Sequence, residues 1–235
     1  SSLHFLFITE EELPVFESMG FLIRHSFQFH WKNNFYKDFD EFLGNLKRKR
    51  RKEIIRERKQ IQQQMIKVEV LEGEAILVEH INYMYEFYLS TSEKKWGHPY
   101  LSKDFFSRIH QTMCNNLVLF LAYVDGDCVA GTINFKNGKC LYGRYWGCKG
   151  NFRSLHFELC YYQPIEYAIR KGISLFEAGA QGEHKIQRGF LPELTYSAHW
   201  LEHPGFRSSI SKFLEEEKAA IDQGIEEFTP HSPYR

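Results

Sequence analysis

The chain has 235 residues, and its 30 basic and 30 acidic side chains give a formal net charge of zero. This balance excludes a protein that binds nucleic acid through its total charge, so only a local basic cluster could bind a polyanion. The five cysteines form no CxxC pair, which argues against a zinc knuckle or a redox pair and favours reduced thiols in a cytoplasmic protein.

The first 32 residues predict a strand, a helix and a second strand, with Thr9 as the N-cap of the helix and Gly20 as its C-cap. Such a piece is too small to fold alone, so it must pack on a later segment or end a preceding domain. The sequence begins without a methionine and without the pattern of a signal peptide, and we expect it to be part of a longer protein. It contains no apolar run long enough to span a bilayer.

A basic helix is predicted after Asp38. Its first apolar face is formed by Phe39, Phe42, Leu43 and Leu46. The helical pattern continues without a break through residues 47–59, where nearly every side chain is basic. We expect Lys47, Arg48 and Arg51 to bind an anionic group, such as the phosphates of tRNA or of a phosphate-bearing substrate. The alternative is a solvated helix whose Glu and Arg side chains pair three or four positions apart.

The middle of the chain predicts a short strand at residues 68–71 and two helices. In the first helix an apolar stripe is formed by Leu77, Ile81, Met84 and Tyr88, which we expect to be core. Trp96 and Gly97 are expected to end this helix, and a second amphipathic helix is predicted at residues 103–113.

Residues 117–146 predict three antiparallel strands. The pairs Asp125-Gly126 and Asn137-Gly138 are the strongest short signals for a β-hairpin turn. In the middle strand, Gly131 indicates a bulge or a close approach of another backbone.

A strand, a helix and a strand are predicted in residues 141–177, with Ser154 capping the start of the helix and Gly172 its end. A polar loop follows, and loops at strand ends are where α/β proteins place their sites. The remaining residues predict a strand at 193–201 and a helix at 207–228.

Two stretches of the sequence resemble the FemAB-like proteins of peptidoglycan biosynthesis or recognition, a branch of the GCN5-related N-acyltransferase (GNAT) superfamily. They are SLHFELCYYQPIEYAIRKGISLFEAGAQGEHKIQRGFLP, and FQFHWKN followed by FDEFLGNLKRKRRKEI. The resemblance covers nearly the whole chain. It implies an α/β (α+β), GNAT-like fold, with a central mixed and mostly antiparallel sheet flanked by helices. Members of this group usually carry two tandem halves, so it also implies that residues 1–32 end a preceding half and that residues 33–235 form a FemAB-like domain.

The resemblance implies transfer of an acyl or aminoacyl group to an amine acceptor such as a peptidoglycan precursor. The acyl donor would be aminoacyl-tRNA or acyl-CoA. Relatives that use acetyl-CoA bind its pyrophosphate on a loop of the form [QR]xxGx[GA], whereas residues 148–153 here contain one glycine at the wrong spacing, which disfavours CoA. The alternative is a recognition protein without catalytic activity that binds an anionic cell-wall precursor or tRNA through the basic helix.

Acyl transfer to an amine needs a base and hydrogen-bond donors for the developing oxyanion. The candidate bases are Glu183, His184, His156 and Glu158. Substrate-binding candidates are Arg144, Trp146, Gln181, Lys185 and Arg188. In the alternative interpretation, His156 is a buried core histidine and Glu158 pairs with Arg153 or Lys149. The acidic and histidine side chains lack the spacing of a metal site, so no metal is expected.

Overall fold

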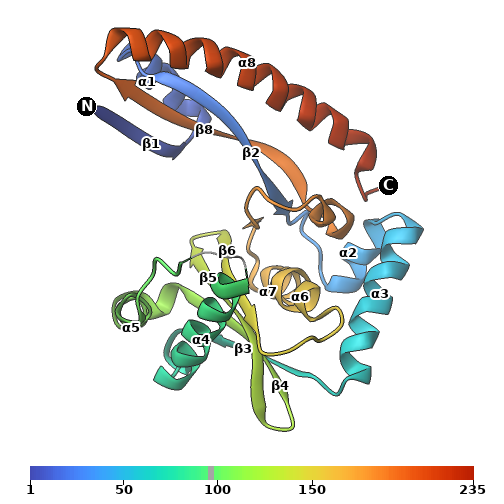
Figure 1. Ribbon diagram of the computed structural model, residues 1–235. Helices are drawn as coiled ribbons and strands as arrows, with labels where there is room; N and C mark the ends of the chain where they lie inside the picture. The colour runs from blue at the N-terminus through green and yellow to red at the C-terminus, as the bar shows by residue number, and fades with distance from the viewer. Residues whose placement is uncertain (95–97) are drawn as a thin grey trace. The chain divides into compact units, whose positions relative to one another are not determined.

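In the computed structural model, which describes residues 1–94 and 98–235, the chain divides into two units (Figure 1). Unit 1 contains Ser1–His30 and Ala180–Ser232, and unit 2 contains Trp31–Gly179 and Pro233–Arg235. The assignment of residues 1–32 to the end of a preceding half stays a prediction.

Unit 1 is built on three strands in the order β1, β8, β2. Strand β8 (Leu191–Leu201) pairs antiparallel with β1 (Ser2–Ile8) on one side and with β2 (Leu22–Lys32) on the other. The predicted strand–helix–strand piece is therefore confirmed, and a distant segment supplies the strand on which it packs. Between β1 and β2 lie the 3₁₀ turn η1 (Glu10–Glu12) and helix α1 (Leu13–Ser18).

The caps predicted for this first helical segment are present. The backbone N–H of Thr9 donates to the Glu12 carboxylate at 2.7 Å, as in a capping box. Gly20 has a φ of +77°, a conformation that favours glycine at the end of a helix.

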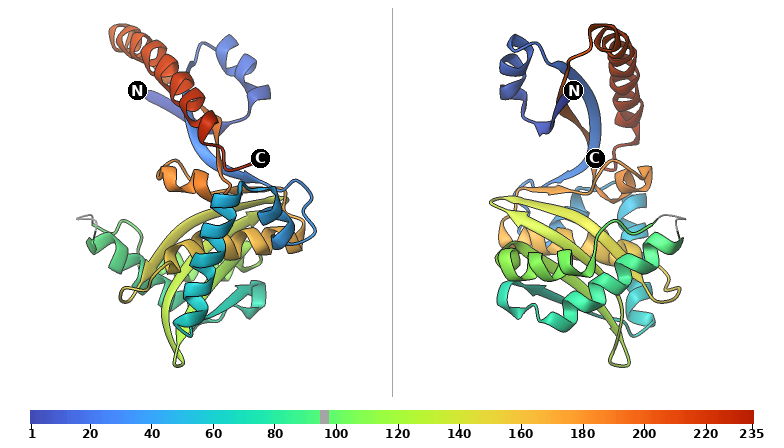
Figure 2. Two further views of the ribbon diagram at one scale, coloured as in Figure 1. Left: turned by 90° about the vertical axis from the view of Figure 1, so that its right-hand side faces the viewer. Right: turned by 60° about the vertical axis from the view of Figure 1, so that its left-hand side comes forward.

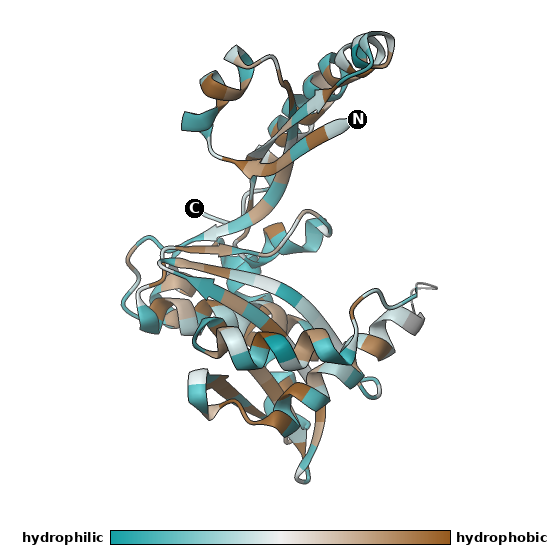
Figure 3. Ribbon diagram, turned by 90° about the vertical axis from the view of Figure 1, so that its left-hand side faces the viewer, coloured by the Kyte–Doolittle hydropathy of each residue, from teal (hydrophilic) through white to brown (hydrophobic). Residues whose placement is uncertain are grey.

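Helix α8 (Pro204–Phe228) runs along the β2–β8 pair (Figure 1). The ring of Phe228 lies 5.8 Å from each of the rings of Phe27 and Phe29, and Glu217 accepts hydrogen bonds from Arg24 at 2.6 and 2.8 Å. Strand β1, at the outer edge of this sheet, is partly exposed to solvent. Its residues Leu6 and Phe7 are 65% and 64% exposed. Figure 3 shows several apolar positions along the strand that starts at the N-terminus.

Unit 2 is built on five strands in the order β7, β6, β5, β4, β3. The predicted meander is confirmed as β4 (Leu117–Val124), β5 (Asp127–Asn137) and β6 (Cys140–Cys148), joined by turns in which Asp125, Gly126 and Gly138 have positive φ. At its two ends, β3 (Lys67–Glu72) pairs antiparallel with β4, and β7 (Leu175–Glu177) pairs parallel with β6. The sheet is therefore mixed and mostly antiparallel, as the sequence predicted.

One face of this sheet is covered by α4 (Val78–Lys94) and α5 (Lys103–Met113), as Figure 2 shows. Two glycines permit the close contact. A Cβ at Gly147 would lie 2.1 Å from the Phe87 carbonyl oxygen, and one at Gly131 would lie 2.7 Å from the Met84 sulfur. The backbone approach predicted at Gly131 was wrong, because side chains of Leu121, Met84 and Phe87 pack there and the close backbone contact lies at Gly147.

The apolar stripe predicted for α4 is largely correct. Ile81, Met84 and Tyr88 are buried, but Leu77 is 53% exposed. Leu77 precedes the helix, and its backbone N–H donates to Nδ1 of His80 at 3.0 Å, which leaves its side chain outside the packed face. The helix end predicted at Trp96 and Gly97 lies outside the described residues.

The other face of the sheet carries the helix that follows β6. This helix consists of α6 (Leu155–Phe157), a π-helical turn (Glu158–Tyr162) and α7 (Gln163–Lys171), and Gly172 ends it with a φ of +63°. Thr132, the neighbour of Gly131 in β5, donates to the Leu159 carbonyl. Because successive strand residues point to opposite faces, this contact places the helix opposite α4.

The basic segment is two helices, not one. Helix α2 (Phe39–Asn45) ends before Leu46, which is extended and forms a β-bridge with Tyr234, and α3 (Arg48–Gln63) begins after Lys47. The Lys47 N–H donates to the Pro233 carbonyl at 2.7 Å. The continuous helix predicted from the sequence was wrong because a segment from the other end of the chain binds the backbone at this point.

Short 3₁₀ turns complete the described elements. They are η2 (Gly73–Ala75), η3 (Cys114–Asn116), η5 (Glu183–Arg188) and η6 (Thr229–His231).

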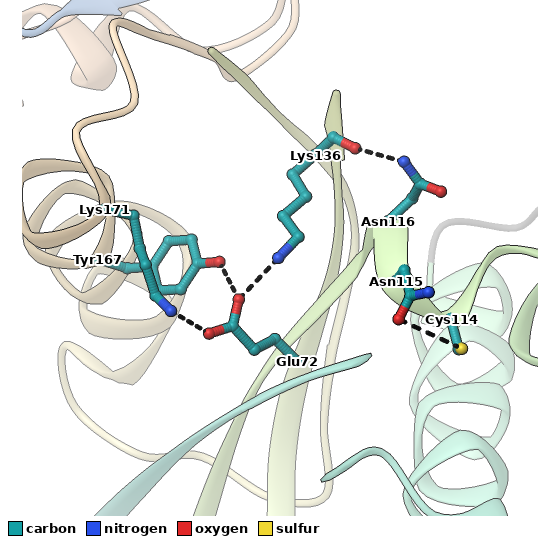
Figure 4. Close-up of polar contacts among 7 residues, drawn as sticks. All are labelled: Glu72, Cys114, Asn115, Asn116, Lys136, Tyr167 and Lys171. Carbon is teal, nitrogen blue, oxygen red and sulfur yellow. Dashed lines mark hydrogen bonds and ion pairs between the residues drawn. The ribbon is translucent and has the colours of Figure 1, made fainter. Parts of the chain in front are cut away.

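Glu72 joins β3 to β5 and α7 (Figure 4). Its carboxylate accepts hydrogen bonds from Lys136 at 2.7 Å, from Tyr167 at 2.6 Å and from Lys171. Burial favours the neutral acid, but these donors outweigh it and lower the pKa of Glu72 to about 2.

We predict that Glu72→Gln lowers the free energy of unfolding by about 1 kcal/mol at pH 7, the upper range for partly exposed ion pairs. Because the folded-state pKa is lowered, this contribution is present above the unfolded pKa of about 4.5 and is lost as pH falls towards 2. Urea unfolding at several pH values should show the difference between variant and parent shrinking over that range. Glu74→Gln, at a nearby exposed carboxylate, is the control and should change little. An equal loss in both variants would contradict this account.

Candidate functional site

Strands β6 and β7 pair over only three residues. Cys140, Leu141 and Tyr142 lie opposite Leu175–Glu177, whereas the remainder of β6 pairs with β5 alone in the part of the chain that the structure describes. Backbone N–H and C=O groups alternate in direction along a strand, so residues 143–148 direct some of these groups away from β5. The sheet therefore opens at the carboxyl end of two parallel strands, where ligands of α/β proteins bind.

A β-bulge lies where this opening begins. Gly143 pairs with Asn134 and Tyr145 pairs with Ile133, so Arg144 between them is an extra residue in β6. Bulges are common next to active sites, where they redirect side chains. The Arg144 side chain is exposed, with its guanidinium carbon 5.7 Å from the centre of the Tyr142 ring.

His156 is brought next to Trp146 at this opening. Their ring centres are 5.2 Å apart and nearly perpendicular, and the ring of Tyr161 lies 5.6 Å from His156 on the helix. His156 is half-buried, so its imidazole is neither a fully enclosed core group nor a fully solvated one. Two residues predicted from the sequence, one on β6 and one on the following helix, are thus in contact.

The start of this helix differs from the prediction. Ser154 has a φ of +62°, and its hydroxyl donates to Gln60 on α3 at 2.8 Å instead of capping the helix. Gln64 fixes the adjacent loop by accepting from the Arg153 N–H at 3.1 Å and donating to the Arg153 carbonyl at 3.0 Å. Side chains at the end of α3 and just after it therefore hold the two residues that precede the helix.

Two backbone N–H groups of the loop between β6 and the helix are already bonded within the protein. Lys149 N–H donates to the Val129 carbonyl at 2.7 Å, and the N–H of Arg153 is bonded to Gln64. A pyrophosphate site on such a loop depends on several free N–H groups at a helix start. This geometry agrees with the unsuitable glycine spacing of residues 148–153.

Glu158 is buried within the π-helical turn, with its side chain 4% exposed. Its Oε1 accepts from Arg58 at 3.1 and 3.2 Å and from Gln163 at 2.8 Å, while Oε2 has no hydrogen-bond partner among the described residues. Burial raises the pKa of Glu158, and the charge of Arg58 opposes this effect. The predicted partners were wrong, because Lys149 pairs instead with Glu86 at 2.6 Å and the cation beside Glu158 is Arg58.

Arg58 links the basic helix to the helix after β6. This role of Arg58 was not predicted from the sequence. Arg58 also bonds Glu166 at 2.7 Å, and its neighbour Glu57 accepts a hydrogen bond from Tyr162. The sequence did contain a signal, since Ile54 and Ile61 are apolar and helical spacing places positions 57 and 58 on the same face as both. π-helical turns often occur at functional sites, and here the turn carries the ion pair.

The predicted anion-binding residues lie at the start of α3. Lys47 and Arg48 are exposed and Arg51 is half-buried. Arg50 pairs with Glu53 at 3.0 Å, three positions on, so α3 also contains one ion pair of the kind expected for a solvated helix.

The polar loop of unit 1 forms the turn η5, with Gln181 just before it. His184 packs on Gly182, where a Cβ would lie 2.5 Å from its Cε1 atom, so only glycine fits. Lys185 and Arg188 are buried, and Arg188 donates to the His184 carbonyl at 2.8 Å. Desolvation, followed by the charges of Arg188 and Lys185, lowers the pKa of His184 and favours its neutral form.

Glu183 is exposed at the start of the same turn. The five candidates from residues 181–188 thus come together in unit 1, while Arg144, Trp146, His156 and Glu158 belong to unit 2.

Within residues 1–94 and 98–235, no three His, Cys, Asp or Glu side chains are placed to hold a metal ion. None of the described helices is long and apolar enough to span a membrane.

Comparison with known proteins gives a family match over residues 1–235, to the FemAB-like family described as peptidoglycan biosynthesis/recognition. The solved structure of L-PGS from Bacillus licheniformis is similar with a TM-score of 0.64 at 10% identity, covering 90% of this chain and 72% of that one. FemX is similar with a TM-score of 0.62 at 12% identity, covering 89% of this chain and 74% of that one. At these identities the likeness shows the fold alone. No protein of curated function matches the sequence.

We predict that Arg58→Met lowers the free energy of unfolding by about 2–3 kcal/mol, because it leaves the Glu158 charge buried without its partner. Protonation of Glu158 would relieve this cost, so the deficit should be largest near pH 8 and shrink as pH falls towards 5. Chemical unfolding across this range measures it. Arg56→Met, two positions away on the exposed face, is the matched control and should have little effect. A deficit that does not depend on pH would show that lost packing, not charge, is responsible.

Proposed function

The chain belongs to the FemAB-like family, as its sequence predicted, and on this premise we propose that it transfers an aminoacyl or acyl group to the amine of a peptidoglycan precursor. The observation that supports this most is the opening between β6 and β7, with a bulge at Arg144 and the His156–Trp146 contact beside it. The solved relatives FemX and L-PGS share the fold in which this opening occurs.

The opening offers the hydrogen bonds that acyl transfer requires. When an amine attacks an acyl carbonyl, the carbonyl oxygen becomes negative and is stabilised by fixed N–H donors. We assign this role to N–H groups of residues 143–147 that point away from β5. They are held by the β5–β6 ladder, so they need not reorganise during the reaction.

We assign His156 as the base that accepts the proton of the attacking amine. As the carbonyl re-forms, the bond between the acyl carbon and the donor breaks, and the donor leaves with that proton. It borders the opening through Trp146, whereas Glu158 is enclosed by its contacts with Arg58 and Gln163 and acts as a positioning group. His184 and Glu183 remain the alternative candidates for this base, and the lowered pKa of His184 supports that alternative. Arg144, Trp146, Gln181, Lys185 and Arg188 stay proposed as substrate-binding groups.

The donor that fits best is aminoacyl-tRNA. The loop that would bind the pyrophosphate of CoA already uses the N–H groups of Lys149 and Arg153, which disfavours acyl-CoA. The exposed charges of α3 suit a phosphate backbone. Reduced cysteines support a cytoplasmic setting, where such a donor is available.

The choice of base is tested by comparing His156→Gln, His184→Gln and Glu183→Gln in an aminoacyl-transfer assay. We expect His156→Gln to lower kcat by about 100-fold or more, because a positioned base contributes that much, with the other two within a few-fold of the parent. Melting temperature and donor binding should be unchanged in all three. A large loss confined to the unit 1 variants would move the base to residues 183–184.

A second candidate function is recognition without catalysis, and the basic start of α3 favours it. Both functions predict tRNA binding, but only the enzyme predicts turnover. If transfer is absent while tRNA or the precursor binds, the recognition function is correct.

The tRNA contact is tested by the triple variant Lys47→Gln, Arg48→Gln, Arg51→Gln. Each lost phosphate contact should reduce the slope of log K against log salt by about 0.7 to 0.9, so three lost contacts should reduce it by about 2 to 3. Filter binding at several salt concentrations measures this slope. The control neutralises three exposed lysines elsewhere, Lys67, Lys103 and Lys212. Equal effects of the two triple variants would show that α3 is not the contact surface.

A further inference from the structure

Two histidines of unit 1 face each other across the outer pair of strands. His4 of β1 and His199 of β8 are direct partners in the antiparallel register. Their Nδ1 atoms are 2.7 Å apart, and the ring centres are 5.0 Å apart with planes inclined at 57°. His4 is exposed and His199 is half-buried, so the pair is open to solvent from one side.

The other nitrogen of each ring is held by a serine. Nε2 of His4 lies 3.0 Å from the Ser2 hydroxyl, and Nε2 of His199 lies 2.8 Å from the Ser197 hydroxyl. A neutral imidazole carries one N–H and one lone pair. The contact between the two Nδ1 atoms is itself a hydrogen bond, in which one ring donates to the other. When each Nε2 instead donates its hydrogen to a serine, both Nδ1 lone pairs point between the rings, where a metal ion can replace the shared hydrogen. Metal-binding histidines show this arrangement, in which the second ring nitrogen is fixed by a hydrogen bond.

We propose that His4 and His199 bind a divalent transition-metal ion of the zinc, nickel or copper type through their two Nδ1 atoms. Imidazole nitrogen suits these ions, and water would complete the coordination. With bond lengths of about 2.0–2.1 Å, the two nitrogens must separate to roughly 3 Å. Such a shift is small for two side chains on a strand pair of which β1 is the outer member.

The surroundings keep both rings available. Desolvation, followed by the charges of His4 and Arg24, lowers the pKa of His199, and Glu217 opposes this effect. A lowered pKa favours the neutral imidazole, the form that binds metal ions. Glu217 is occupied by Arg24, and no third His, Cys, Asp or Glu completes a metal-binding group in the described part of the chain. The site thus has two protein ligands, and we expect moderate affinity.

Bound metal would connect β1 to β8 by coordination bonds in addition to the backbone ladder. Strand β1 is the last in its order, and within the described residues no further strand pairs with its outer edge. An ion that binds only where the two strands are paired stabilises that pairing by mass action. The site would therefore adjust how firmly the outer strand is held.

The test is isothermal titration of tag-free protein with ZnCl₂ and, separately, NiCl₂ at pH 7.5. The parent should bind one ion per chain, and His4→Gln and His199→Gln should each weaken binding at least about tenfold. The control is His231→Gln, at an exposed histidine, which should bind as the parent does. Ser197→Ala should weaken binding by a smaller factor, because it removes the hydrogen bond that orients the ring.

Circular dichroism of each variant checks that the fold is kept, so that lost binding is not mistaken for unfolding. The melting temperature of the parent should rise with metal, and that of the two histidine variants should not. The proposal is overturned if the parent does not bind either ion, or if folded His4→Gln and His199→Gln bind with the parent's affinity.

Discussion

The unequal pairing of β6 is the constraint on which the proposed site depends. On one side β6 follows β5 along nearly its whole length, and on the other it meets β7 for only three residues. The extra residue Arg144 lies at the point of separation, so the ladder with β5 changes register where the contact with β7 ends. The strand is thus held rigidly on one side and left without a strand partner on the other, as far as the described residues show. A rigid row of backbone donors is what an acyl-transfer site requires.

The basic helix α3 supplies the cation that pairs with two carboxylates on the helix after β6. Arg58 of α3 bonds both Glu158 and Glu166, and Glu57 bonds Tyr162, so the inner face of α3 is a polar contact with the helix after β6. The outer face keeps Lys47 and Arg48 exposed. One helix therefore both fixes the helix that carries His156 and presents positive charge to a polyanion. Buried ion pairs contribute little net stability, but they require one arrangement of their partners, which suits a positioning role.

Local signals in the sequence predicted local structure well. The turns at Asp125-Gly126 and Asn137-Gly138 and the helix end at Gly172 depend on nearby residues and were correct. The family and the mixed sheet were also predicted. The sequence did not reveal the helix break at Leu46, which depends on Tyr234, or the pairing of β1 and β2 with β8. Long-range contacts also decide the Arg58–Glu158 pair and the bulge at Arg144, for which no short pattern exists.

The most direct measurement of the central claim is hydrogen–deuterium exchange of the full chain with and without a non-hydrolysable aminoacyl-adenosine analogue. If the acyl group binds at the opening, amides of residues 143–147 should become protected, because the donor supplies the partner that β7 does not. Amides of residues 183–188 and of β4 should exchange as before. Protection confined to residues 183–188, or no protection at saturating analogue, would contradict the account.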